Sequence, residues 1–318
     1  MTDNNPKKMT WVSLHTHTTF SHGDGFGTVP AHFDRIQSLG MDTVAFTEHR
    51  STSVWVQAEI EARKRGMKAI FGCEFDVAMP NEPRRRHFHQ TVLAMNDEGL
   101  ANLNRLITLA WKQTHYVPRL YVPQLLDPKL TGGLIVLSGC ADSLLSCTIL
   151  GGKSFGDKKA DWEPEDVKAG RILVEQYQEV YGDRYYLECQ QFPQLERSTI
   201  LNQTFQDIAS VTGVECAATA DVHYPFAPDN EMQRLLHAAH RGGTIETQDA
   251  DWEYNIALTY PESDDAIFDA LRRQQLEPLE ISNAIINTRK IADRCEVELP
   301  KAAPLRYRAT RKDLEPWV

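Results

Sequence analysis

The sequence lacks the features of several large protein classes. No apolar run in its 318 residues approaches the roughly 20 residues that a membrane-spanning helix needs. The opening MTDNNPKK has no apolar core of the kind found in a secretion signal. The six cysteines are irregularly spaced and include no CxxC pair, which favours reduced thiols over a disulfide framework. These absences predict a cytoplasmic protein without membrane contact.

Excess positive charge is missing too. The formal net charge of −10 argues against a general binder of duplex nucleic acid, whose affinity comes from Lys and Arg at phosphates. An enzyme that acts on a strand end remains compatible with this charge, because bound divalent cations can make one pocket attractive to phosphate. No GxGxxG follows the first apolar run, which argues against a dinucleotide-binding fold.

Short runs of β-branched and aliphatic residues predict seven strands, at 11–15, 43–47, 69–75, 90–95, 134–138, 185–188 and 216–221. Helical periodicity predicts helices between most of them, at 31–39, 54–65, 97–112, 167–180 and 196–212. Repeated alternation of strand and helix predicts a largely parallel sheet. Seven repeats in this length favour an α/β fold of distorted (β/α)7, TIM-like barrel type over an open sheet.

This pattern predicts that the chain has three parts. Residues 1–240 are expected to form the barrel, and residues 241–300 a small helical extension with a helix at 279–295. Residues 301–318, which are rich in proline and positive charge, are expected to be a tail.

Residue types that bind metals recur near the ends of the predicted strands. His15 and His17 end the first run and, two residues apart on an extended segment, project to the same side. Glu48-His49, Glu74, Cys140 and the pair Asp221 and His223 end later runs. His89 instead precedes its run, so either that strand is antiparallel or the preceding loop carries the imidazole to the same mouth. Because barrel sites lie at the carboxyl ends of the strands, these residues predict a metal cluster and hydrolytic chemistry.

An ordered set of segments resembles one known family. The segments are LHTHTTFSHGDG (14–25), AFTEH (45–49), GCEFDV (72–77), HQTVLAMNDEGLANL (89–103), LIVLSGC (134–140), YYLECQ (185–190), ATADVHY (218–224), EMQRLLHAA (231–239) and NTRKIADRCEVELP (287–300). They resemble the polymerase and histidinol phosphatase (PHP) domain, in the form found at the amino terminus of bacterial DNA polymerase III alpha subunits. The chain stops near the point where polymerase sequence would begin, so polymerase activity is not predicted.

Carried over position by position, the resemblance implies nine metal ligands: His15, His17, Asp24, His49, Glu74, His89, Cys140, Asp221 and His223. It implies three divalent ions, held by His15, His17, Glu74 and Asp221, by Glu74, His89 and Cys140, and by Asp24, His49 and His223. Mixed imidazole, carboxylate and thiolate ligands suit Zn²⁺, with Mn²⁺ or Fe²⁺ as alternatives. Within this set we expect catalytic roles for Asp24, His49, Glu74 and His223.

Several assignments have a local competitor. His87 stands two residues from His89, and His22 is close to Asp24, which itself occupies a turn-like Gly-Asp-Gly stretch. Cys140 is alternatively a buried thiol of the core.

Other polar residues have assignments outside the ligand set. Glu48 is interpreted as a residue that orients a ligand. Arg50, Arg84 and Arg86 are predicted to contact substrate phosphate, with a solvated loop charge as the alternative. No role is assigned to four further histidines: His32, His115, His237 and His240.

Metal ligands of this kind predict phosphoester hydrolysis. The resemblance narrows the reaction to a 3′–5′ exonuclease that releases nucleotides from a DNA 3′ end, with a replicative polymerase on a separate chain as a candidate partner. One alternative is a small-molecule phosphatase of the histidinol phosphatase type. Another is a non-catalytic PHP module that docks on a polymerase and keeps its metals for folding.

Overall fold

The computed structural model describes residues 8–80, 87–154, 162–247 and 256–301. The strands are β1 (Thr43–Phe46), β2 (Lys68–Ala78), β3 (Phe88–Ala94), β4 (Arg119–Tyr121), β5 (Leu134–Leu137), β6 (Tyr185–Gln190) and β7 (Cys216–Thr219). The helices are α1 (Val29–Ser38), α2 (Trp55–Arg65), α3 (Asp97–Lys112), α4 (Val122–Leu125), α5 (Leu144–Ile149), α6 (Val167–Tyr181), α7 (Glu196–Thr212), α8 (Asn230–Arg241), α10 (Asp264–Arg273) and α11 (Pro278–Arg294). Two short 3-10 helices lie at Gly182–Arg184 and Ala227–Asp229. None of the described helices is both long and apolar enough to cross a membrane.

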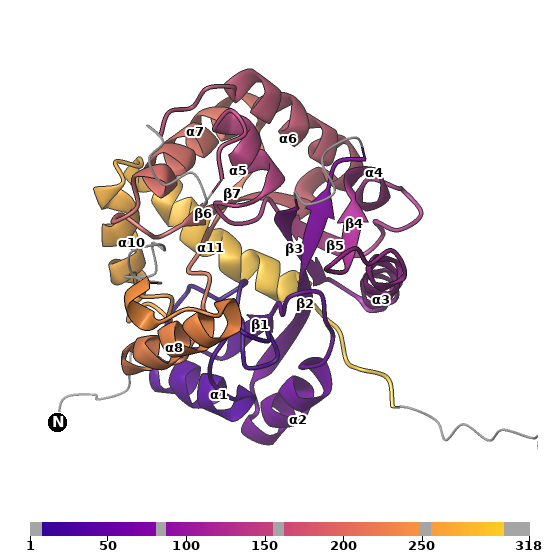
Figure 1. Ribbon diagram of the computed structural model, residues 1–318, viewed down its shortest axis with the longest axis vertical. Coiled ribbons are helices and arrows are strands. Elements are labelled where there is room, and N and C mark those ends of the chain that lie inside the picture. Colours follow the sequence, from indigo (N-terminus) through magenta and orange to yellow (C-terminus); the bar gives the residue numbers. More distant parts are fainter. Residues whose placement is uncertain (1–7, 81–86, 155–161, 248–255, 302–318) are drawn as a thin grey trace, which may run out of the picture.

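One curled, seven-stranded sheet forms the centre of the molecule. Its strand order is β1-β2-β3-β5-β6-β7, and β4 pairs with β2 beyond the end of β1. Helices surround the sheet in sequence order, from α1 and α2 through α3 to α6 and α7 (Figure 1). The expected distorted barrel of α/β type is therefore confirmed, and five of its predicted helices appear within two residues of the expected bounds.

Two strand predictions need correction. Residues 11–15 form no regular strand. Ser13 makes a single parallel bridge to Val44 of β1, and the following Thr16 makes one to Val222 beyond β7. This extended segment spans the opening between the two edge strands. The structure also contains β4, a three-residue strand too short to show an apolar period.

The direction of β3 settles the question raised by His89. β3 pairs antiparallel with both β2 and β5, whereas the other strand pairs of the sheet are parallel. An antiparallel strand begins at the edge where its parallel neighbours end. His89, the second residue of β3, therefore reaches the same mouth as residues that follow β1, β5 and β7.

The carboxyl-terminal helices close the opposite end of the barrel. Side chains inside the sheet, among them Leu14, Ile70 and Leu137, form one apolar cluster with Ile291 and Ala292 of α11. Figure 1 shows α11 crossing behind the strands. Burial of this kind contributes about 1.5–3 kcal/mol for each large aliphatic side chain. The helix predicted at 279–295 thus completes the core of the barrel, while the proposed division at residue 240 stays a prediction.

Candidate metal centre

His15 and His17 lie at the centre of the barrel mouth. Their side chains are fully buried and their Nε2 atoms stand 3.1 Å apart. The intervening Thr16 points to the other side, where its hydroxyl pairs with that of Ser13 at 2.7 Å. The HxH spacing therefore presents two imidazoles together, as predicted.

Glu74 lies among four imidazoles. It occupies the point at which β2 leaves β1 and pairs with β3, so its carboxylate reaches the barrel interior. Its oxygens stand 3.4 Å from His15 Nε2, 3.2 Å from His17 Nε2, 3.0 Å from His49 Nδ1 and 3.2 Å from His89 Nδ1. A carboxylate in this place can bridge two ions, as the resemblance implies.

His89 and Cys140 form one flank of the centre. The Cys140 Sγ stands 3.5 Å from His89 Nδ1 and, with Glu74, both residues belong to a group whose ligand atoms lie within 4.8 Å of one another. Between β5 and Cys140, Gly139 adopts a φ of +88°, and a Cβ added there would lie 2.5 Å from the His89 carbonyl oxygen. Only glycine accommodates both this φ and this close approach.

Gly139→Ala is therefore expected to lower the free energy of unfolding by about 1–3 kcal/mol and to separate Cys140 from His89. Urea unfolding measures the first effect, and the metal content of the dialysed protein measures the second. Gly182→Ala is a suitable control, because its φ is +59° and nothing lies within 4 Å of the added Cβ. Equal metal content in the Gly139→Ala protein and the wild type would contradict the expectation.

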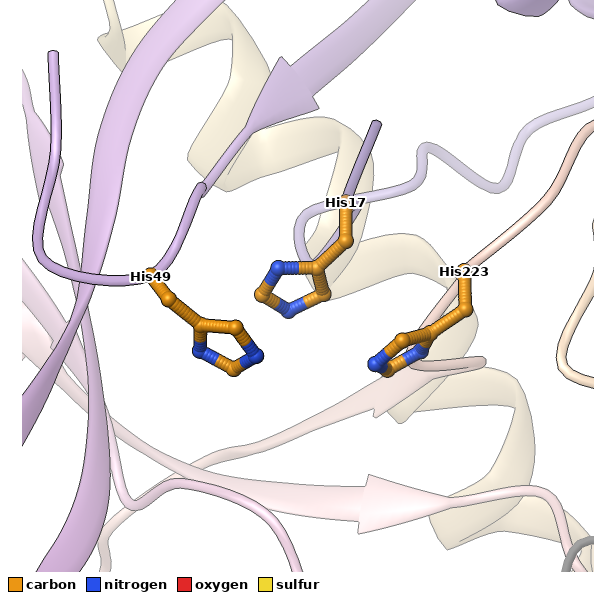
Figure 2. A group of neighbouring side chains, drawn as sticks. All are labelled: His17, His49 and His223. Atoms are coloured by element: carbon orange, nitrogen blue, oxygen red, sulfur yellow. The ribbon is translucent and has the colours of Figure 1, made fainter. Parts of the chain in front are cut away.

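Asp24, His49 and His223 form the opposite flank. The Asp24 Oδ2 stands 2.7 Å from His49 Nε2 and 3.2 Å from His223 Nε2. His49 follows β1, and His223 follows β7. Figure 2 shows the rings of His49 and His223 directed toward that of His17 from separate segments of the chain.

All nine predicted ligands are thus gathered at one mouth. Three groups have ligand atoms within 4.8 Å of one another: His17 with His49 and His223, His15 with His17 and Asp221, and Glu74 with His89 and Cys140. The last of these matches one implied set in full. His17 also lies close to the set of Asp24, His49 and His223, so it stands between two of the implied ions.

Around His15 and His17, the distances between ring nitrogens and carboxylate oxygens fit a shared metal ion better than direct hydrogen bonds. Two ligand atoms on one tetrahedral Zn²⁺, each at about 2.0–2.1 Å, lie about 3.4 Å apart. The nitrogen–oxygen separations of His15 and His17 from Glu74 and Asp221 run from 3.2 to 3.8 Å. Within the described residues, Glu74 Oε1 and Asp221 Oδ1 are buried and accept no hydrogen bond. Such oxygens suit a cation.

Electrostatics holds the carboxylates ionised. Burial alone would raise the pKa of Asp24, but His223, His237 and His49 keep it well below its usual range. Burial alone would lower the pKa of His223, but Asp24 and Asp221 raise it to about 9. Burial and the adjacent His49 lower the pKa of His17 to about 3. The mouth is therefore a network of anions and imidazoles in which no single charge is independent.

Hydrogen bonds orient three of the rings from behind. His15 Nδ1 lies 2.7 Å from Glu188 Oε1, His17 Nδ1 lies 2.8 Å from Ser21 Oγ, and His223 Nδ1 lies 2.8 Å from the Asp221 carbonyl. Each contact occupies one ring nitrogen and directs the other toward the centre. Metal-binding histidines are held in this way, because the outer hydrogen bond fixes the tautomer.

Glu48 stabilises the loop that carries Asp24. Its buried carboxylate accepts hydrogen bonds from the Thr18 backbone and hydroxyl and from the Ser21 hydroxyl. Ser21 in turn contacts His17 Nδ1, so Glu48 reaches the predicted ligands through Ser21, and its role as an orienting residue stays a prediction.

The competing assignments separate clearly. The His87 Nε2 lies 3.4 Å from Asp76 Oδ1, and the His22 ring packs against that of His240. Neither residue belongs to one of the three groups of ligand atoms found among the described residues. Arg50 forms an ion pair with Asp76, with its Nε 2.9 Å from Oδ2, and its role as a substrate contact stays a prediction. Arg84 and Arg86 lie outside the described residues.

One contact at the mouth was not predicted. His237 of α8 is buried, and its Nε2 contacts the Asp24 Oδ1. A usable signal was present, because Gln233 and His237 stand four residues apart and both lie on the buried face of α8. Polar residues on a buried helix face call for polar partners.

We expect His237→Ala to reduce turnover by about 10–100-fold, the range typical of residues that orient a metal ligand. His240→Ala is the matched control, since it removes an imidazole from the same helix on its exposed side. Steady-state hydrolysis and thermal unfolding are compared for both proteins. Equal activity of the two variants would show that Asp24 needs no support from α8.

A pocket opens over the centre. Every predicted ligand except His15 and His17 lines it, together with Phe192, Leu195, Arg197, Ile256 and Leu258 among others. The side chains of Asp24, His49 and His223 are 20, 11 and 7% exposed, while those of His15 and His17 are fully buried. His89 on the other flank is 30% exposed, so a ligand in the pocket can reach both flanks, while His15 and His17 lie beneath them.

The sequence matches one family of known proteins. The profile of the PHP domain matches residues 13–192. The chain belongs to the PHP family. DNA polymerase III subunit alpha of Helicobacter pylori strain J99 is 27% identical over 303 residues, which cover 91% of this chain and 23% of that protein. The same subunit of Treponema pallidum is 28% identical over 309 residues, covering 94% of this chain and 24% of the relative.

This PHP chain thus spans about a quarter of the length of the curated relatives it matches. Among solved structures, an amidohydrolase from Chromobacterium violaceum with bound sulfate aligns with a TM-score of 0.40 and 15% identity. The alignment covers 67% of this chain and 88% of the other.

Proposed function

We propose that this protein is a metal-dependent phosphoesterase that removes nucleotides from DNA 3′ ends. The observation that carries the proposal is the convergence of five imidazoles, three carboxylates and one thiol at a single mouth beneath an open pocket. Membership of the PHP family supports hydrolysis, and the likeness to DNA polymerase III alpha subunits supports a DNA substrate. On the same grounds, a replicative polymerase is a candidate partner.

Divalent ions bound at this centre would polarise the phosphoryl oxygens and lower the pKa of a water molecule. The residues of the chain have separate tasks. Glu74 would bridge two ions, since its oxygens face histidines on both flanks. Asp24, His49 and His223 would hold one ion within reach of the substrate, and Glu74, His89 and Cys140 another, because all six residues line the pocket. Glu188 and Ser21 keep His15 and His17 in the required orientation.

A single-stranded oligonucleotide carrying an internal label and a free 3′ end tests the proposal. The protein is incubated with Zn²⁺, Mn²⁺ or Fe²⁺, with and without a chelator. Stepwise shortening from the 3′ end that stops with chelator supports the exonuclease. Hydrolysis of phosphomonoesters without shortening of DNA would favour the small-molecule phosphatase, and no hydrolysis of either substrate with bound metal would favour the docking module.

A further inference from the structure

One wall of the pocket is apolar although its floor is polar. The wall consists of Phe192, Leu195, Ile256 and Leu258, which line the pocket beside Asp221 and His223. These residues form a small apolar cluster with Tyr224 and Phe26, separate from the two cores of the barrel. Holding metal ions or a bare phosphate requires charged and polar groups, so this wall serves neither purpose.

The apolar wall is fixed to the predicted ligands by short hydrogen bonds. The backbone N–H of His223 donates to the Leu258 carbonyl at 2.8 Å. The hydroxyl of Tyr224 accepts from the Leu258 N–H at 2.8 Å and from Asn230 Nδ2 at 2.9 Å. On the other edge, Gln190, two residues before Phe192, donates to Asp221 Oδ2 at 3.1 Å. Hydrogen bonds therefore hold both edges of the apolar wall in a fixed position relative to His223 and Asp221.

We propose that the apolar wall is a subsite for the nucleoside group of the ester, with the base lying against Phe192 and Leu258. The inference rests on the proposed function and names the part of the substrate that gives affinity. A nucleobase offers a flat face that packs on aromatic and aliphatic side chains, and this packing does not depend on base identity. The phosphate attached to that nucleoside then lies over the predicted ligands that line the pocket beside the wall, among them Asp221 and His223. A polar alcohol phosphate gains nothing from such a wall.

Two esters with the same leaving group measure how much the nucleoside group contributes to hydrolysis. Thymidine 5′-(p-nitrophenyl phosphate) carries a nucleoside, and methyl p-nitrophenyl phosphate carries a methyl group in its place. The metal-loaded wild type should prefer the thymidine ester in kcat/KM. Phe192→Ala should reduce that preference by about 10-fold, as expected for loss of one stacking contact with a base. Leu258→Ala should reduce it as well. Phe226→Ala is the matched control, since Phe226 is 39% exposed and does not line the pocket.

Ile256→Ala provides a third variant with a smaller risk to folding, because Ile256 is only half-buried. An unchanged preference in the variants that fold overturns the subsite. If the wild type hydrolyses neither ester, the proposed function is in doubt, and the subsite is tested separately by equilibrium binding of thymidine 5′-monophosphate and inorganic phosphate. The quantity compared is the ratio of the dissociation constants of thymidine 5′-monophosphate and inorganic phosphate. A higher ratio in the variants than in the wild type supports the subsite, and an unchanged ratio overturns it.

Discussion

Asp24→Asn is expected to reduce phosphodiester hydrolysis by more than the roughly 100-fold that marks the loss of an outer contact around a metal. Asparagine keeps the shape of the side chain but removes its negative charge. Asp24 lies against His49, His223 and His237 and lines the pocket, so it would hold an ion that the substrate can reach. Initial rates on the labelled oligonucleotide measure the effect.

The fold should survive this substitution. Asp24 belongs to a loop at the mouth and lies outside the apolar clusters that join the sheet to its helices. Thermal unfolding of the variant should therefore remain cooperative. Asp34→Asn is the control, since it neutralises a carboxylate in α1 whose ion pair, with Arg65, is distant from the mouth. An Asp24→Asn protein that is folded and fully active would exclude a catalytic role for Asp24.

Part of the ligand set could be predicted because its placement follows from a local pattern. The carboxyl ends of parallel strands meet at one end of a barrel, so residues that end such strands come together whatever their separation in sequence. His49 and the pair Asp221 and His223 follow this rule through β1 and β7. Asp24 does not follow it, because it lies in a loop.

Other features depend on contacts that no local pattern encodes. The direction of β3 is set by pairing with β2 and β5, and the sequence of β3 alone is compatible with either direction. His237 meets Asp24 across 213 residues, through the packing of α8 over the mouth. The apolar wall likewise joins Phe192 to Leu258, two segments that carry no metal-binding residue. Tertiary packing decides all three.

Removal of metal is expected to abolish hydrolysis and lower stability while leaving the protein folded. Glu74 Oε1 and Asp221 Oδ1 accept no hydrogen bond from the described residues, and their ion-pair contacts are with histidine nitrogens 3.2 to 3.8 Å away, so a bound cation would satisfy both buried oxygens. Each ion should stabilise the native state by about 2.7 kcal/mol when its concentration is a hundred times its dissociation constant. Elemental analysis, hydrolysis and thermal unfolding are followed before and after dialysis against a chelator.

The metal-free protein should still fold because its histidines can replace part of the missing charge. Asp24 and Asp221 raise the pKa of His223 to about 9, so near neutral pH this imidazole is protonated and pairs with both carboxylates. The chelator should therefore abolish hydrolysis while cooperative unfolding remains. Readdition of Zn²⁺ or Mn²⁺ should restore hydrolysis to the wild type and leave Asp24→Asn inactive. Cooperative unfolding lost together with activity would instead assign the metals to folding, and hydrolysis that persists in metal-free protein would remove the metal centre from the mechanism.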